Sequence, residues 1–222
     1  LKGVAIYAEK LKELGYSDRS TGRFIIRAMF STITNANWDN RRFESLISEA
    51  MGLRDNLRAR FEEEHQKKHG SPFTGKLHDA ATWKAYEEVE GSKVPELVGI
   101  LSTENEDVRS LRELLTIGLK GIGAYADHAA VLGFEDDDIY DFIISALAST
   151  TRHLPAEEMV SLVMKAGEAS VSTMALLDKA HTTTYGSPEI SEVNLGVRNN
   201  PAILISGHDL KDMEELLEQT EG

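Results

Sequence analysis

The residue best suited to chemistry is His208, which follows Gly207 and precedes Asp209. The short apolar run at residues 202–206 comes just before it and predicts an inner strand of a parallel sheet. Ligands of open α/β sheets bind beyond the carboxyl ends of such strands. Asp209 is suited to begin a helix, so His208 would lie beside a helix N-terminus, where a metal or an anionic ligand can be held.

The other histidines have weaker patterns. His65 and His69 are four residues apart on a predicted helix, which is a metal-ligand spacing. They lie among the glutamates at 62–64 and the lysines at 67–68, a setting typical of a solvated helix end, and we interpret them as surface residues. His128 and His153 have no acidic residue at ligand spacing and are interpreted as structural or exposed. We assign no catalytic residue.

The composition restricts the classes of partner. The 222 residues include 37 acidic and 24 basic side chains, and the net charge of −13 opposes binding to nucleic acid or to anionic lipid. The sequence has no run of apolar residues long enough for a transmembrane helix, so we predict no membrane span. Cysteine is absent, which excludes disulfides and also any thiolate-held cluster built by this chain alone.

An internal repeat appears when the chain is compared with itself at an offset of 118 residues. Between residues 1–32 and 119–150, 14 of 32 positions are identical without gaps. Tyr7 then matches Tyr125, and Gly3 matches Gly121. Because both copies keep these residues, we predict that they make the same close helix contacts in each copy.

Each copy predicts three helices. The expected helices span residues 2–14, 19–34, 39–68, 107–132, 136–151 and 156–181. Between the copies we expect a loop at 69–75 and short helical stretches near 80–89 and 94–101. The opening helix of the first copy starts about twelve residues later than its counterpart, which predicts that the chain begins inside a helix.

These elements predict a mainly α fold. Two tandem duplicated three-helix bundles would be followed by the first βα unit of a Rossmann-like α/β domain. The expected boundaries are 1–98 for the first bundle, N-terminally truncated, with its connector, 99–187 for the second bundle, and 188–222 for the start of the α/β domain. A lone parallel strand has no partner for its backbone groups, so the chain is expected to stop just inside that domain.

The sequence at residues 184–212, TYGSPEISEVNLGVRNNPAILISGHDLKD, closely resembles the hybrid cluster protein family, also called prismane proteins or hydroxylamine reductases. The resemblance extends over the helical region before it and so covers essentially the whole chain. In that family the histidine of Ser-Gly-His-Asp-Leu is a ligand of an iron–sulfur–oxygen cluster, which implies that His208 is a metal and cofactor ligand. Arg198, Asn199 and Asn200 could line the cluster cavity or only organise the turn, and they stay unassigned.

The resemblance implies that this chain is a fragment of a cytoplasmic iron–sulfur oxidoreductase. The parent would carry an iron–sulfur cubane, held by cysteines upstream of Leu1, and the hybrid cluster, whose other ligands lie beyond Gly222. The implied reaction is the two-electron reduction of hydroxylamine to ammonia and water, with a further link to nitric oxide reduction. The expected partners are that small-molecule substrate, an electron donor protein and the remaining parts of the same polypeptide, but no nucleic acid and no membrane.

Alone, the fragment is expected to bind no cluster and to be inactive, because it offers one ligand and no thiolate. Two alternatives stay open. The absence of cysteine favours a cofactor-free helical interaction module. Kinship with nickel-containing carbon monoxide dehydrogenases would share the broad fold class, but it fits the Ser-Gly-His-Asp-Leu sequence less well.

Overall fold

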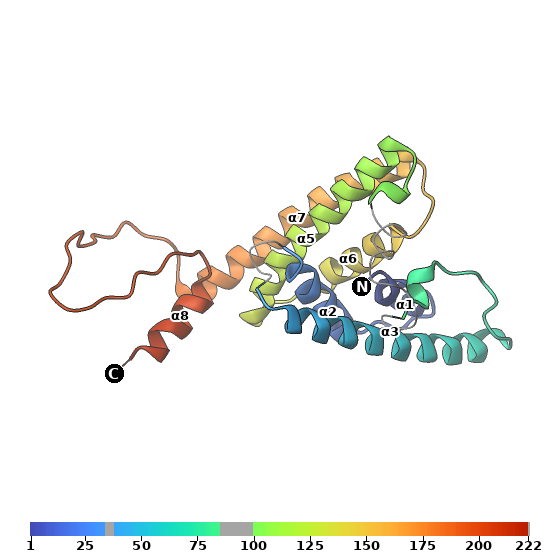
Figure 1. The fold of residues 1–222 in the computed structure, drawn as a ribbon, viewed down its shortest axis with the longest axis horizontal. Coiled ribbons are helices and arrows are strands. Elements are labelled where there is room, and N and C mark those ends of the chain that lie inside the picture. Colours follow the sequence, from blue (N-terminus) through green and yellow to red (C-terminus); the bar gives the residue numbers. More distant parts are fainter. Residues whose placement is uncertain (34–37, 85–99, 222) are drawn as a thin grey trace.

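The computed structural model describes residues 1–33, 38–84 and 100–221, which form helices and loops but no β-strand. The helices are α1 (Lys2–Glu13), α2 (Arg19–Phe30), α3 (Asn40–His69), α5 (Glu106–Val131), α6 (Asp137–Ser149), α7 (Ala156–Tyr185) and α8 (Leu210–Gln219), with short 3₁₀ turns η2 (Asp79–Ala81) and η3 (Ile100–Ser102). Figure 1 shows α5 and α7 side by side, and α8 near the C-terminus. The mainly helical prediction is confirmed, with each of the six repeat helices present. The predicted connector helices lie largely outside the described residues.

Matching residues begin and end matching helices in the two copies. The carboxylates of Asp18 and Asp136 each accept a hydrogen bond from the backbone N–H two residues further on, at 3.1 and 2.9 Å. Such side chains satisfy donors that the first turn of a helix leaves unpaired. Gly15 and Gly133 follow the ends of α1 and α5 with φ angles of 95° and 84°, which glycine adopts at little cost. The duplicated sequence therefore repeats its helix boundaries.

The two copies meet around an approximate two-fold axis between α2 and α6. Arg19 and Asp137 are related by the repeat offset, yet they bind each other, with Arg19 Nε 2.8 Å from Asp137 Oδ1. Gly22 and Tyr140 also match, and Gly22 lies against the Tyr140 side chain. The reciprocal packing of α1 on α6 and of α5 on α2 is the pattern that a two-fold axis produces, and matching positions meet where they lie close to it.

The copies share a large hydrophobic core, and a smaller cluster of Phe24, Ala28 and Leu46 lies within the first copy. α1 packs against α3 and against α6 of the other copy, while α2 packs against α5 and α6. One continuous cluster of buried residues contains Val4 and Ile25 from the first copy together with Leu119 and Ile143 from the second. The domain boundaries at 98 and 187 stay predictions.

The prediction that repeated residues pack alike holds for one copy only. Tyr7 is 4% exposed and packs on Phe61 of α3, whereas Tyr125 is 42% exposed. Gly3 lies against the backbone of η2, whereas a side chain at Gly121 would meet no atom within 4 Å. The packing prediction is therefore wrong for Tyr125 and Gly121, which lie on an open part of α5 although α7 packs along this helix.

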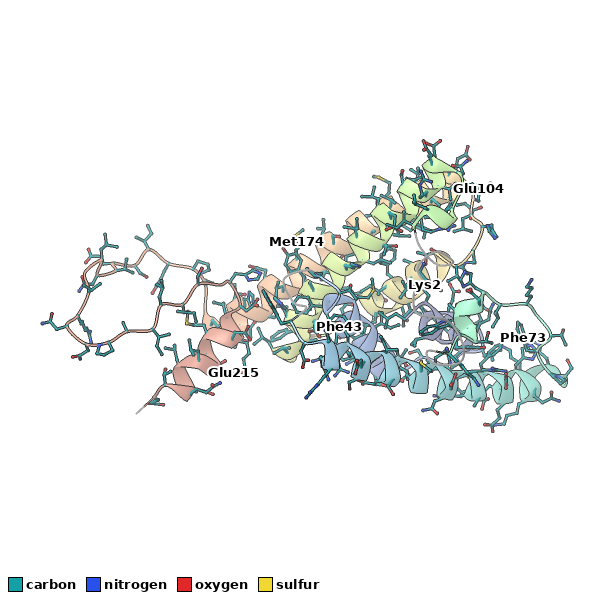
Figure 2. All side chains as sticks on the ribbon, in the orientation of Figure 1. Lys2, Phe43, Phe73, Glu104, Met174 and Glu215 are labelled. Carbon is teal, nitrogen blue, oxygen red and sulfur yellow. The ribbon has the colours of Figure 1, made fainter. Side chains whose placement is uncertain are left out.

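α7 has an apolar outer surface. Met164, Val171 and Met174 are 66%, 63% and 49% exposed, and Figure 2 labels Met174 on this helix. By length and composition α7 could cross a membrane, with a mean hydropathy of 1.2 in its most apolar window. The sequence criterion of an uninterrupted apolar run missed this property. Core helices of soluble proteins, which are mostly buried, have the same property. In α7, which packs along α5, only 11% of that window is buried.

The predicted strand at 202–206 is absent. These residues have no regular secondary structure, and the side chains of Ile203 and Leu204 are 72% and 98% exposed. A parallel strand requires a neighbouring strand for its backbone hydrogen bonds, and the described part of the chain supplies none. The βα unit is therefore present only as its helix, α8, which begins after Asp209 as predicted.

Candidate functional site

His208 lies in the turn that leads into α8, and its side chain is 77% exposed. Asp209 occupies the N-cap position of α8, but its carboxylate accepts no hydrogen bond from the backbone of this helix. Asp209 is thus at the predicted N-cap position, but its side chain does not cap the helix. The Asp209 carboxylate can therefore interact with the neighbouring histidines instead.

Two imidazole rings converge on the Asp209 carboxylate. Asp209 Oδ1 lies 3.4 Å from Nδ1 of His208 and 3.2 Å from Nδ1 of His128, which comes from the last turn of α5. Both distances are within ion-pair range, yet neither contact has hydrogen-bond geometry, and Oδ1 is buried without a hydrogen bond. The site therefore holds an acidic oxygen that can still accept a hydrogen bond from either ring.

His128 connects this turn to the helical core. Its side chain is 17% exposed and packs edge-on against the ring of Phe30, with ring centroids 5.1 Å apart. Its ring centroid lies 5.9 Å from that of His208. The sequence interpretation found no acidic partner for His128, because Asp209 is far away in the sequence and only the fold brings the two together.

Burial affects the acidic residue beside His128. Desolvation raises the pKa of Asp127 above its ordinary value, although the nearby charges of Arg23, His128 and Arg27 oppose this shift. Asp127 and His128 are both half-buried, so charges at this end of α5 interact more strongly than at an open surface. The α8 N-terminus adds partial positive charge beside His208.

His208 can supply one ligand to a metal, but the described residues do not form a complete metal site. A contact between its Nδ1 and a carboxylate leaves Nε2 available, which is the usual arrangement of a ligating histidine. Within the described ranges, no group of three or more His, Cys, Asp or Glu residues could hold a metal ion. Further ligands would have to come from elsewhere.

The histidine pair on α3 has a packing role. The rings of His65 and His69 are 4.4 Å apart, and His65 also packs against Phe61 and Phe73 at 5.6 and 5.4 Å. His65 Nδ1 lies 3.2 Å from the backbone oxygen of Ser71. These contacts are typical of an aromatic cluster that closes the end of a helix. Residues 198–200 are exposed and stay unassigned.

Comparison with known proteins identifies the family. The sequence matches the Prismane/CO dehydrogenase family over residues 1–222. The chain belongs to this family. Hydroxylamine reductases from Nitratidesulfovibrio vulgaris, Halothermothrix orenii and Desulfitobacterium hafniense are 61%, 57% and 53% identical to it over its whole length. The chain spans about 40% of the length of each of these relatives.

The match confirms the resemblance inferred from residues 184–212. These relatives are longer than the 222 residues of this chain, which contain no cysteine. What the sequence reasoning missed is the convergence of His128 and His208 on Asp209. No sequence spacing signals this contact, since it depends on where α8 lies relative to α5.

Proposed function

We propose that the complete protein is an iron–sulfur oxidoreductase that reduces hydroxylamine to ammonia and water. The observation that carries this proposal is the identity of 61% over the whole chain with a protein named hydroxylamine reductase. The reaction breaks the N–O bond, consumes two electrons and two protons, and leaves nitrogen reduced by two electrons. The electrons come from a separate donor protein, and nitric oxide is a second candidate substrate.

His208 is the residue of this chain proposed to bind the hybrid iron–sulfur–oxygen cluster. Its exposed ring and the buried acceptor oxygen of Asp209 beside Nδ1 fit a single imidazole ligand whose Nε2 points to a metal. When bound, the cluster would supply the redox chemistry and an exchangeable iron site. Asp209 would hold the neutral ring in one orientation, and His128 would anchor Asp209 to α5. Cysteines outside these residues would complete the cluster and a separate cubane.

The helical repeats are proposed to be a scaffold that positions the turn at His208 and contacts the remaining polypeptide. The exposed apolar side chains of α5 and α7, such as Ile117 and Met164, support a protein contact. Lys165 and Glu168 interrupt the α7 surface, which disfavours lipid as its environment. We therefore propose a protein without a membrane span. The cytoplasm, whose reducing conditions preserve thiolates, is its proposed location, and the net charge disfavours nucleic acid as a partner.

Residues 202–206 are proposed to become an inner strand of a Rossmann-like α/β domain in the complete protein. Their β-branched, apolar side chains are poorly suited to the solvent exposure they have here. Neighbouring strands from the rest of the polypeptide would pair with their backbone groups. That pairing would place His208 at a strand end beside the α8 N-terminus.

Metal analysis of the complete protein tests the proposed function against its alternatives. We expect iron and acid-labile sulfide in amounts sufficient for two clusters, no nickel, and hydroxylamine-dependent oxidation of a reduced dye. Stoichiometric nickel with carbon monoxide oxidation would instead support a carbon monoxide dehydrogenase-like protein, which the family description includes. A complete protein without iron would support a cofactor-free interaction module and contradict the proposal.

A further inference from the structure

The internal repeat continues beyond the two long helices, α3 and α7. Both helices are 30 residues long, and each is followed by the sequence Gly-Ser-Pro, at residues 70–72 and 186–188. The two triplets are 116 residues apart, as are the ends of the two helices. Residues 71–83, the first-copy segment, therefore match residues 187–199, the second-copy segment.

A turn of the same kind lies at the same place in both segments. In the first-copy segment the backbone N–H of Ala80 donates to Nδ1 of His78 at 3.1 Å. In the second-copy segment the backbone N–H of Gly196 donates to Oδ1 of Asn194 at 2.8 Å. The two acceptors match at the offset of 116 residues, and so do the two donors. Such a side chain shapes the backbone locally, so this match is independent of the helices.

The first-copy segment folds back across α1 and α3. Phe73 and Leu77 pack against the core, and Ala81 is 1% exposed. The backbone oxygen of Ala80 comes so close to Gly3 of α1 that a β-carbon there would collide with it. Glycine at position 3 therefore allows the chain to cross α1 at this point.

In the described part of the second copy, both matching surfaces are open. The second-copy segment runs away from α5 in the long loop before α8 (Figure 1), and its Val193 and Val197 are 75% and 98% exposed. Their first-copy counterparts pack against the core. On α5, a β-carbon at Gly121, the counterpart of Gly3, would meet no atom within 4 Å. The two surfaces that meet in the first copy are therefore apart in the second.

The open face of α5 and α7 is suited to an apolar partner. On α7, Val171 and Met174 are 63% and 49% exposed, whereas the matching residues of α3 are Asp55 and Arg58. The second-copy segment carries exposed apolar side chains at positions 190, 193, 195 and 197. Contact between this segment and the open face would remove apolar area from water on both sides, which stabilises a folded-back path.

The two segments differ at the glycine that ends each helix. Gly70 has φ 72° and ψ 4°, whereas Gly186 has φ 87° and ψ 168°. Glycine adopts both conformations at little cost. Rotation about the Cα–C bond of Gly186 would therefore turn the second-copy segment toward α5 while α7 keeps its helical structure.

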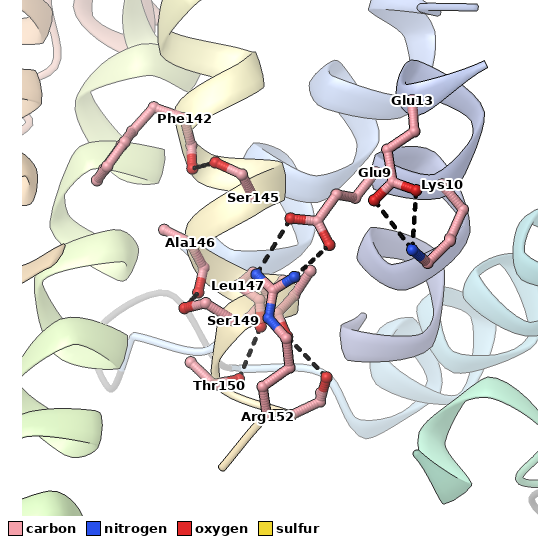
Figure 3. Close-up of polar contacts among 12 residues, drawn as sticks. Glu9, Lys10, Glu13, Phe142, Ser145, Ala146, Leu147, Ser149, Thr150 and Arg152 are labelled. Atoms are coloured by element: carbon pink, nitrogen blue, oxygen red, sulfur yellow. Dashed lines mark hydrogen bonds and ion pairs between the residues drawn. The ribbon is translucent and has the colours of Figure 1, made fainter. Parts of the chain in front are cut away.

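Ion pairs oppose a shift of the first copy onto the open face. Arg152, which follows α6, forms a two-pronged ion pair with Glu9 of α1, at 2.9 and 3.1 Å (Figure 3). Bidentate pairs fix orientation as well as distance. Together with the pair between Arg19 and Asp137, this contact ties the first copy to α6 and its C-terminal end. A large shift of the first copy would break both pairs.

We propose that, in the complete protein, residues 187–199 fold back onto the open face of α5 and α7 and cross α5 at Gly121. The first-copy segment supplies the pattern, with Gly196 in the place of Ala80. Pairing of the strand proposed at 202–206 would hold the far end of the segment. The fold-back would tether the loop before this strand to the second copy, and it is independent of the proposed reaction.

Cross-linking in the complete protein tests this path. Arg54 of α3 donates to the backbone oxygen of Trp83, and the matching residues, Ser170 and Asn199, should lie close together once the segment folds back. We expect a short bismaleimide to join Ser170→Cys to Asn199→Cys at least about tenfold faster than it joins Ser172→Cys to Asn199→Cys, because position 172 is on the opposite side of α7. Peptide mass mapping separates each product from those of native cysteines. Equal rates for the two pairs would overturn the proposal.

Gly121→Ala provides a second arm in the same protein. An added β-carbon would obstruct the backbone that crosses α5 in the folded-back path, so we expect the faster cross-link to form at least about fivefold more slowly. Gly118→Ala is the matched control and should leave the rate unchanged, because its β-carbon would lie 4.0 Å from Ala166, an ordinary contact. An unchanged rate with Gly121→Ala would overturn the proposal. A Ser170→Cys thiol that the reagent does not modify would also overturn it, because another part of the polypeptide would then cover the face.

Both arms measure cross-linking rates, which require neither a bound cluster nor turnover. Hydroxylamine reduction without the faster cross-link would overturn the fold-back alone. The faster cross-link without hydroxylamine reduction would support the fold-back and contradict only the proposed function.

Discussion

Gly22→Ala is a sharp test of the two-fold packing between α2 and α6. A β-carbon at position 22 would lie 2.7 Å from both Cβ and Cγ of Tyr140, closer than such atoms approach in folded proteins. Tyr140 is 3% exposed, and its hydroxyl donates to Glu135 at 2.8 Å, while Arg23 binds the same carboxylate at 3.0 Å. The ring therefore has little freedom to move away.

Two effects of opposite sign decide the result. Alanine is better than glycine within a helix by about 1 kcal/mol. Overpacking a tight interface costs roughly 1–3 kcal/mol, and the held ring places this site at the upper end. We therefore expect Gly22→Ala to lower the free energy of unfolding by about 2 kcal/mol.

Urea denaturation followed by circular dichroism measures this difference. Gly121→Ala is the matched control, because an added β-carbon there meets no atom within 4 Å. It should raise the free energy of unfolding by about 0.5–1 kcal/mol. If Gly22→Ala stabilises the chain as Gly121→Ala does, then α2 and α6 are not packed through this pair and the two-fold arrangement is wrong.

Three further outcomes are expected. In the complete protein, His208→Ala should lower hydroxylamine turnover by about two orders of magnitude and alter the magnetic-resonance signal of the hybrid cluster. The control variant His65→Ala should change neither. Normal turnover of the His208→Ala variant would exclude His208 as a ligand. Asp18→Ala should cost about 1 kcal/mol at pH 7 in thermal unfolding, because an N-cap is lost. Burial raises the pKa of Asp18, but hydrogen bonds from Ser20 and Thr21 outweigh it and lower the pKa overall. The greater stability of the wild type over Asp18→Ala should therefore be lost as the pH falls through this lowered pKa. A stability difference that persists in strong acid would contradict this assignment. Limited proteolysis of the 222-residue chain should cut first within the exposed residues 187–207, and cuts appearing first within α5 would contradict the described fold.

Local signals in the sequence were sufficient for the helices. Aspartate caps, apolar periodicity and the glycines after α1 and α5 each act over a few residues, so they can be interpreted without tertiary structure. The strand predicted at 202–206 does not form in the described chain, because its hydrogen-bond partners must come from distant residues. The repeat predicted equal surroundings for Tyr7 and Tyr125, but burial depends on what lies next to a helix as well as on the helix itself.

The candidate site also contains residues that local sequence signals indicate and residues that only the fold brings together. His208 is a candidate ligand by its turn and by family resemblance, whereas only the fold shows that His128 approaches Asp209. Asp209 occupies the expected N-cap position, but its side chain makes no capping hydrogen bond and lies beside His128 of α5. Residues whose role depends on long-range contact are therefore the ones that sequence patterns leave undecided in this chain.

The contact between unlike residues at matching positions has a consequence for the ancestry of the fold. A free first repeat that paired with itself would bring two Arg19 guanidinium groups together over an empty space beside Gly22. A free second repeat would oppose two Asp137 carboxylates and force two Tyr140 rings into room for one. Each repeat would thus pair poorly with a copy of itself, whereas the two different repeats pair well. At this interface the two repeats are complementary, so each fits the other repeat better than it would fit a second copy of itself.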